Sequence, residues 1–127
     1  MRTLAAYDYA VVRVVPRVER GEFLNVGVIV SCESARLLQA RIELDESRVL
    51  ALDPTVDLEL LRQHLGAIPR RCAGDADAGP IAALPLRARF HWLTAPRSTI
   101  VQTSPVHRGQ CVDPAAALEH LLARMVR

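Results

Sequence analysis

Apolar and polar side chains alternate through three segments in the first third of the chain, and this period of two constrains the fold more than any other feature. The segments cover residues 7–15, 23–32 and 38–44. Such alternation is typical of β-strands, in which successive side chains point to opposite faces. A charged connection containing Gly21 joins the first two segments, and a short turn joins the next two. The sequence therefore predicts a three-stranded antiparallel meander.

The pattern becomes helical after residue 44. We expect a short helix over residues 46–52, followed by a longer helix that Asp53-Pro54 or Asp57 caps and Pro69 closes. The apolar side chains of the longer helix recur every three or four residues, so this helix can cover the apolar face of the sheet. They are Leu58, Leu61, Leu65 and Ile68.

The second half of the chain mixes loops with two further strands. Residues 89–93 and 98–103 have strand character, whereas residues 72–80 and 104–110 are expected to be loops. A final helix begins at Asp113-Pro114 and carries an apolar stripe suited to docking. The stripe consists of Leu118, Leu121, Leu122 and Met125.

These elements predict an α+β protein with a mostly antiparallel sheet of about five strands and two or three helices packed on one face. The chain has 127 residues, too few for two independent cores, so residues 1–127 are expected to form a single domain. Half of the residues are hydrophobic and 24% are charged, which is the composition of a folded globular protein rather than a disordered one.

Three features of the sequence indicate the cytoplasm as the location. No apolar run approaches the roughly 20 residues that a membrane-spanning helix needs. The first residues contain neither the apolar segment nor the cleavage site of an export signal. Cys32, Cys72 and Cys111 are isolated and odd in number, which suits free thiols in a reducing compartment.

The charge balance argues against a nucleic-acid partner without excluding one. The formal net charge is only +2, whereas nucleic-acid-binding domains usually carry a strong basic patch. All sixteen basic residues are arginine and none is lysine, a bias that GC-rich coding alone can produce. Single arginines therefore carry little functional information. Clusters of arginine remain informative, because guanidinium binds carboxylate and phosphate through two parallel hydrogen bonds.

No motif defines an active site or a cofactor. The chain lacks the glycine-rich phosphate-binding loops, the H-E-x-x-H zinc motif and any C-x-x-C pair. We therefore assign no catalytic residue, metal ligand or cofactor. His64 and His120 fall on expected helices with no second ligand one turn away, so they are interpreted as surface residues.

The first polar cluster surrounds the connection between the first two strands. It consists of Arg13, Arg17, Glu19, Arg20, Glu22 and Asn25. Its arginines could bind an anion while the carboxylates orient them and Asn25 donates from the sheet. The alternative is an ion-paired hairpin loop in which Asn25 satisfies a backbone group. Ion pairs on protein surfaces are common, so the pattern favours this structural alternative.

The second polar cluster lies in the last third of the chain. It consists of Arg89, Phe90, His91, Trp92, Arg97, Ser98, Thr99, Gln102, Ser104 and His107. On the expected strand, Phe90 and Trp92 would point into the core, with Arg89 and His91 opposite. A hydrolytic serine–histidine pair lacks both a nucleophile elbow and an orienting acid. An oxyanion site at residues 97–99 fits better, since guanidinium, hydroxyl and backbone N–H groups all donate to anions.

Three stretches of the chain together resemble the bacterial family numbered 3037 among the domains of unknown function. They are YDYAVVRVVP at residues 7–16, RGEFLNVGVI at 20–29 and RFHWLTAPRS at 89–98. The resemblance implies no established activity. Members of the family are often encoded beside a HipA-like kinase, and this resemblance implies that such a kinase could be a partner or a substrate. The polar motif positions of the family map onto Arg13, Arg20, Glu22, Asn25, Arg97, Ser98 and His107.

Our leading hypothesis is a non-catalytic accessory module in which the sheet brings both clusters together in one anion-binding groove. The candidate residues are Arg13, Arg17, Arg20, Glu22, Asn25, Arg97, Ser98 and His107. One alternative is a small enzyme acting on a phosphorylated or nucleic-acid substrate, with Glu22 or His107 as general acid or base. It requires Glu22, Arg97 and His107 to converge within hydrogen-bond reach in a pocket. A third hypothesis is a structural homo-oligomer.

Overall fold

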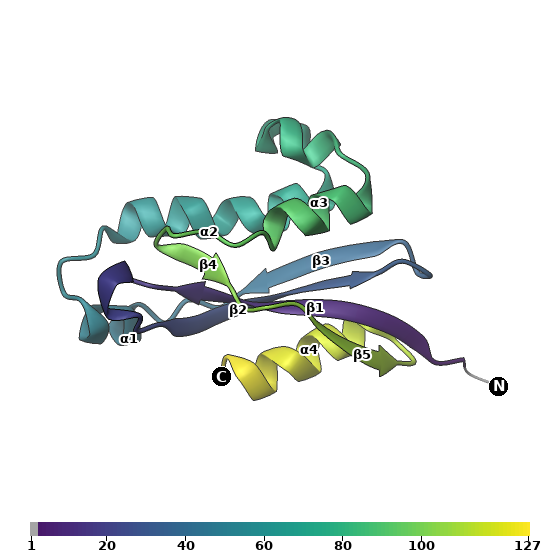
Figure 1. Ribbon diagram of the computed structural model, residues 1–127, viewed down its shortest axis with the longest axis horizontal. Helices are drawn as coiled ribbons and strands as arrows, with labels where there is room; N and C mark the ends of the chain where they lie inside the picture. Colours follow the sequence, from purple (N-terminus) through teal and green to yellow (C-terminus); the bar gives the residue numbers. More distant parts are fainter. Residues whose placement is uncertain (1–2) are drawn as a thin grey trace.

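The computed structural model describes residues 3–127, and its centre is a five-stranded antiparallel sheet (Figure 1). The strand order is β3-β2-β1-β4, and β5 also pairs with β1. The three-stranded meander expected from the alternating segments is therefore confirmed. The strands are β1 (Ala5–Val14), β2 (Leu24–Cys32), β3 (Leu37–Ile42), β4 (Val101–Thr103) and β5 (His107–Cys111).

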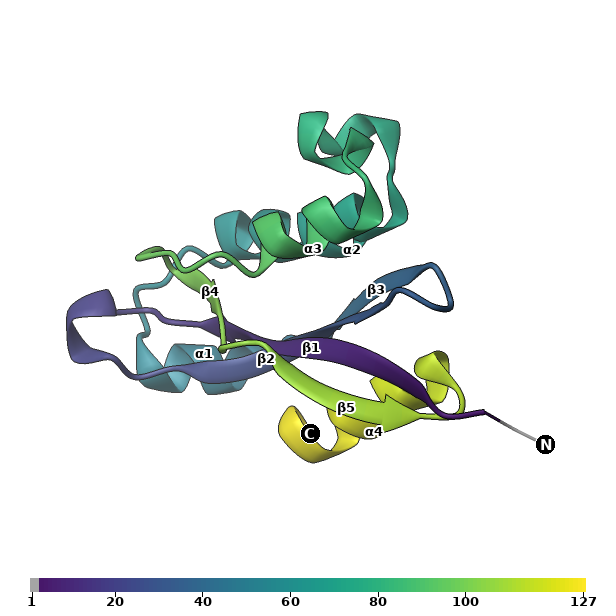
Figure 2. The ribbon, with the colours of Figure 1, turned by 45° about the vertical axis from the view of Figure 1, so that its right-hand side comes forward.

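The strand β1 is long enough to pair with two short strands along one edge. Figure 2 shows the chain passing from β4 into β5 alongside β1. Ser104 lies between them, where its N–H donates to the Val11 carbonyl at 2.8 Å and its Oγ accepts from the Val11 N–H at 2.9 Å. The expectation of a loop over residues 104–110 is therefore wrong for residues 107–110, because pairing with β1 turns this polar segment into an edge strand.

Helices cover both faces of the sheet. Figure 1 shows α2 (Leu58–Ala73) and α3 (Leu86–Leu93) over one face and α4 (Pro114–Met125) on the other, with α1 (Glu46–Leu52) near one end. The α+β class and the five strands are confirmed, whereas the expected placement of all helices on one face is not. The reason lies in β2, whose residues from Val26 to Cys32 are all buried. A strand that is apolar on both faces needs cover on both.

The expected strand over residues 89–93 is the helix α3. Leu86, Phe90 and Leu93 recur at helical spacing and pack into the core beneath α2. A short apolar run can fit either period, and here the helical stripe determines the outcome. Trp92 consequently does not enter the core but is 37% exposed.

The helix α2 continues through Pro69, where the sequence predicted its end. It stops at Gly74, which has a left-handed φ of 75° and whose N–H approaches the carbonyls of Arg70 and Arg71. Glycine adopts this conformation without the steric penalty of a Cβ. The extra turn brings Arg71 onto the helix, and this placement shapes the site described next.

Within residues 3–127, no helix is long and apolar enough to cross a membrane. Cys32, Cys72 and Cys111 are free thiols. Burial raises the pKa of the Cys72 thiol to about 12, so this group stays protonated and unreactive at neutral pH.

Candidate ligand cleft

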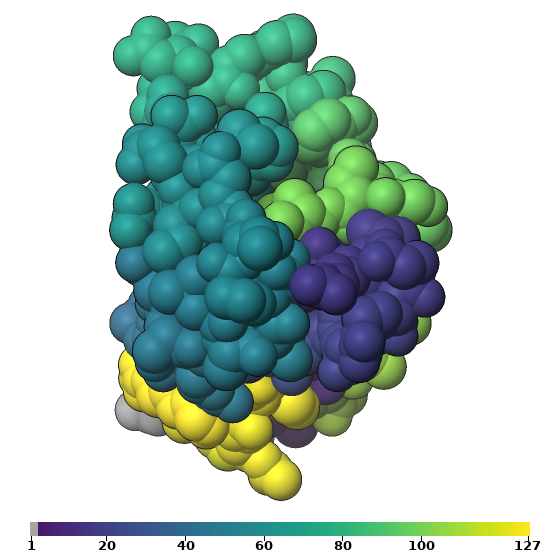
Figure 3. Space-filling view, turned by 90° about the vertical axis from the view of Figure 1, so that its left-hand side faces the viewer, coloured from purple at the N-terminus to yellow at the C-terminus, as the bar shows by residue number. Residues whose placement is uncertain are grey.

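A cleft of about 350 Å³ lies between α2, the end of α3 and β4. We call it the Trp92 cleft. Figure 3 shows α2 and the segment leading into β4 side by side at this end of the molecule. The lining residues are Gln63, His64, Ala67, Ile68, Arg71, Trp92, Leu93, Arg97, Thr99, Val101, Gln102 and Thr103. The volume is within the range of small-molecule sites.

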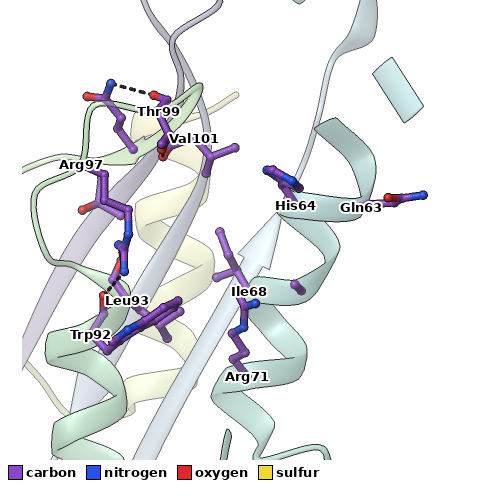
Figure 4. A pocket seen from close by; sticks show the side chains of 12 residues that line it. Gln63, His64, Ile68, Arg71, Trp92, Leu93, Arg97, Thr99 and Val101 are labelled. Carbon is purple, nitrogen blue, oxygen red and sulfur yellow. Dashed lines mark hydrogen bonds between the residues drawn. The ribbon is translucent and has the colours of Figure 1, made fainter. Parts of the chain in front are cut away.

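One wall of the cleft is a single face of α2. His64, Ile68 and Arg71 are spaced by four and three residues, so they lie one above another along the helix. Figure 4 shows these side chains projecting from α2 towards Trp92 and the segment that carries Arg97. Ile68 is buried, as is Leu93 at the end of α3. The cleft therefore has an apolar floor with polar groups around it.

Two guanidinium groups approach the ring of Trp92. The Cζ atom of Arg97 is 4.4 Å from the ring centroid, and that of Arg71 is 5.2 Å from it. Both distances are within the range of cation–π attraction. The only tryptophan in the chain thus holds two positive charges at the cleft.

The guanidinium of Arg97 also binds the end of α3. Its Nη1 donates to the carbonyls of Leu93 at 3.3 Å and Ala95 at 3.2 Å, and its Nη2 donates to the Trp92 carbonyl at 2.6 Å. The last carbonyls of a helix have no partner within the helix and carry partial negative charge. Arg97 is therefore a helix cap as well as a charge at the cleft, and most of its donors are engaged.

Arg71 has a much less occupied guanidinium. Its Nε donates to the Ala78 carbonyl at 3.5 Å, while its terminal nitrogens donate to no protein group within residues 3–127. It forms no ion pair in that part of the chain. The residues that line the cleft include no aspartate or glutamate. The cleft therefore carries uncompensated positive charge, and Arg71 is the group best able to bind an anion.

The hairpin residues of the predicted groove pair among themselves or with nearby carboxylates. Arg20 forms an ion pair with Glu22, and Arg17 lies 3.7 Å from Asp53. Hydrogen bonds from Thr55, followed by the charge of Arg17, hold the pKa of Asp53 below its usual value. The ion-paired hairpin loop, which was the structural alternative, matches this arrangement.

Arg13 and Asn25 face each other across a β-bulge between β1 and β2. The Arg13 guanidinium stacks on Phe23, with its Cζ 4.1 Å from the ring centroid. Asn25 Nδ2 donates to the Met125 carbonyl at the end of α4 at 3.0 Å. Arg13 Nε and Asn25 Oδ1 are buried, and neither has a hydrogen-bond partner within residues 3–127. The hydrogen bond to Met125 ties Asn25 to α4, on the sheet face opposite α2 and the Trp92 cleft. Arg13 lies on the same face, because its neighbours Val12 and Val14 pack into the core beneath α2.

Two further predicted residues, His107 and Ser98, also lie outside the Trp92 cleft. His107 lies on β5, with its ring centroid 5.5 Å from that of Tyr9. Ser98 is exposed beside Arg97 but does not line the cleft. Within residues 3–127, Glu22, Arg97 and His107 neither share a pocket nor contact one another. Of the predicted groove residues, only Arg97 lines the Trp92 cleft, and the convergence that the enzyme hypothesis requires is not formed.

Sequence reasoning missed Arg71. His64 is exposed, as the sequence predicted, but it also lines the cleft. The signal that could have found them is their spacing of seven residues, with Ile68 between them, on a helix that extends beyond Pro69. In the described part of the chain, no group of three or more His, Cys, Asp or Glu side chains could hold a metal ion.

Together the sheet with helices on both faces and the arginine-flanked cleft define an α+β protein with a candidate anion-binding site. The family described as protein of unknown function (DUF3037) matches residues 9–126. The chain belongs to this family, as the resemblance indicated. No curated protein and no solved structure matches the chain.

Proposed function

We propose that the protein is a non-catalytic accessory module that binds a small organic anion in the Trp92 cleft. The observation that carries this proposal is the pair Arg71 and Arg97 at Trp92, above an apolar floor and with no carboxylate in the lining. A guanidinium without a carboxylate partner binds phosphate or carboxylate more strongly than one already paired. The apolar floor favours a ligand with an apolar part over an inorganic ion.

The polar groups of the cleft support binding rather than catalysis. Nucleophilic catalysis needs a hydroxyl or thiol hydrogen-bonded to a base. The Thr99 hydroxyl donates to the Val101 carbonyl at 2.9 Å, and the Thr103 hydroxyl lies 3.4 Å from the Thr94 carbonyl. Neither is bonded to His64, which is the only histidine in the lining.

The fluorescence of Trp92 provides a direct test, because this residue is the only tryptophan and lines the cleft. The probe is (tetrahydropyran-2-yl)methyl phosphate, compared with its neutral alcohol. We expect the phosphate to change the fluorescence saturably and the alcohol not to. A ligand that binds only the folded state at 100 times its Kd should also stabilise it by about 2.7 kcal/mol.

The variant Arg71→Met keeps the length and apolar contact of the side chain but removes its charge. We expect it to weaken binding of the phosphate at least tenfold. The matched control is Arg124→Met, because Arg124 is exposed on α4 and has no ion pair within residues 3–127. Equal binding by the two variants, or equal binding of the alcohol, would show that the cleft is not an anion site.

We also keep two proposals about partners. One is a HipA-like kinase, and the other is self-association into a homo-oligomer. Co-purification of the tagged protein with such a kinase tests the first. Light scattering after size-exclusion chromatography tests the second, and a monomeric mass at every concentration would remove it.

A further inference from the structure

The two walls of the Trp92 cleft differ in their hydrogen-bonding character. On the α2 wall the charged group is Arg71, which has no acceptor and whose terminal N–H groups have no protein partner within residues 3–127. Gln63 and His64 beside it can both donate and accept. The opposite wall comes from β4 and the segment that leads into it, with Thr99, Gln102 and Thr103. Both threonine hydroxyls and one N–H of Gln102 are engaged with the backbone, which leaves three side-chain oxygens as acceptors and one amide N–H as a donor.

Three hydrogen bonds show how the donors of the β4 wall are used. Thr99 Oγ1 donates to the Val101 carbonyl at 2.9 Å, and Gln102 Nε2 donates to the Thr99 carbonyl at 2.8 Å. Thr103 Oγ1 approaches the Thr94 carbonyl at 3.4 Å. A hydroxyl that donates its only hydrogen keeps its lone pairs, and a glutamine held through its NH₂ group keeps its carbonyl oxygen. This wall therefore suits a ligand that carries donors.

We propose that the ligand of the Trp92 cleft is a sugar phosphate. The phosphate, which is acceptor-only, would bind Arg71, and the sugar hydroxyls would donate to Thr99, Gln102 and Thr103. The C–H face of the sugar ring would pack on the apolar floor formed by Ile68, Leu93 and Val101. This inference rests on the proposed anion-binding function and adds the class of ligand.

The asymmetry of the walls disfavours the simpler anions. Fatty acids and simple aromatic acids carry no hydroxyl donors once ionised, so they would leave the acceptors of the β4 wall without a hydrogen bond from the ligand. Inorganic phosphate has no apolar part to cover the floor of the cleft. Polar groups that lose water without gaining a hydrogen bond cost affinity. A sugar phosphate satisfies both walls, since its charge is at one end and its hydroxyls are on the ring.

The decisive experiment compares ligands that differ only in their hydroxyl groups. Trp92 fluorescence is titrated with glucose 6-phosphate and with (tetrahydropyran-2-yl)methyl phosphate, which has the same ring and phosphate but no hydroxyl. Ribose 5-phosphate and (tetrahydrofuran-2-yl)methyl phosphate form a second pair. We expect at least one sugar phosphate to bind about tenfold more tightly than its counterpart, the gain that one to two net hydrogen bonds supply.

Variants of Thr103 test whether the β4 wall produces the preference. Thr103→Val keeps the shape of the side chain but removes the hydroxyl, and we expect it to reduce the preference to about threefold or less. Binding of the hydroxyl-free phosphate should not change. Thr103→Ser restores a hydroxyl and should restore the preference. Thermal melts of each variant confirm that the fold is retained.

The outcomes distinguish failure of the sugar-phosphate inference from failure of the anion-binding function. If the hydroxyl-free phosphates bind as tightly as the sugar phosphates, the sugar inference is wrong and the anion function stands. If no phosphate ester binds, both fail. If a sugar phosphate binds but Arg71→Met leaves its affinity unchanged, the ligand binds elsewhere and both proposals are again overturned.

Discussion

Arg97 holds Trp92 twice, because its guanidinium stacks on the indole ring at 4.4 Å and donates to the Trp92 backbone carbonyl at 2.6 Å. The same guanidinium also binds the carbonyls of Leu93 and Ala95. One side chain therefore fixes both the ring that forms the cleft and the end of α3. Arg71, on the neighbouring helix, touches the same ring but binds only one carbonyl.

This difference predicts that two similar substitutions change the stability of the protein by different amounts. Arg97→Met should lower the free energy of unfolding by about 1–2 kcal/mol, because three carbonyls lose a charged donor that water replaces only in part. Arg71→Met should change it by less than about 0.5 kcal/mol, as is usual for a surface residue without an ion pair. Urea denaturation measures both values. Equal stabilities of the two variants would contradict the capping role of Arg97.

The two glycines Gly27 and Gly66 should respond oppositely to alanine. A Cβ on Gly27 would lie 2.6 Å from the Arg41 carbonyl oxygen and 2.6 Å from the Ile42 side chain, whereas a Cβ on Gly66 would meet nothing within 4 Å. Gly27→Ala should therefore destabilise the protein by about 1–3 kcal/mol through overpacking. Gly66→Ala lies within α2 and should stabilise it by up to about 1 kcal/mol. Thermal denaturation measures whether each variant is less or more stable than the parent. A Gly27→Ala variant of unchanged stability would show that β3 can move away from β2.

Ser104 should be important for stability although it lies between two strands. Ser104→Ala would leave the Val11 N–H, in a residue that is only 6% exposed, without its acceptor. An unsatisfied buried donor costs about 1–3 kcal/mol. The control is Ser98→Ala, since Ser98 is exposed and forms no hydrogen bond through its side chain within residues 3–127. Hydrogen exchange at the Val11 amide gives a local measurement, and unchanged protection in Ser104→Ala would refute this role.

The sequence predicted the elements that have a long, regular pattern. The strands β1, β2 and β3 follow from alternation over six or more residues, and α4 follows from its cap at Asp113 and its apolar stripe. Residues 89–93 were misassigned because five residues fit both periods. The short strand β5 has a polar sequence and forms only because β1 offers it an edge.

The candidate site was predicted less well, for a topological reason. Arg13 and Arg97 both belong to polar clusters near strand ends, but sequence does not state which face of the sheet each one reaches. The bulge between β1 and β2 and the position of α4 place Arg13 and Asn25 on the α4 face. Arg97 is held by carbonyls at the end of α3, on the α2 face. Arg71 joins it only because α2 continues past Pro69.

Acid should weaken the contact between the end of the chain and the sheet. Arg127 donates to both carboxylate oxygens of Glu43 at 2.9 and 2.7 Å and to Glu119 at 2.7 Å. These hydrogen bonds hold the pKa values of Glu43 and Glu119 below the usual 4.5. A carboxyl whose pKa is lowered by folding stabilises the folded state above its unfolded pKa, and the stabilisation is lost as the pH falls through the folded value.

The variant Arg127→Met isolates this contribution. We expect it to be less stable than the parent at pH 7 and 0.1 M salt, and the difference should shrink as the pH falls below about 4.5, since both proteins then have protonated carboxyls. Raising the salt to 1 M at pH 7 should also shrink it, because Glu43 and Glu119 are partly exposed and their attraction to Arg127 is screened. Arg124→Met should show neither change, because Arg124 forms no ion pair within the described residues. A stability difference for Arg127→Met that persists unchanged at pH 3 would mean that Arg127 acts through packing and not through its charge.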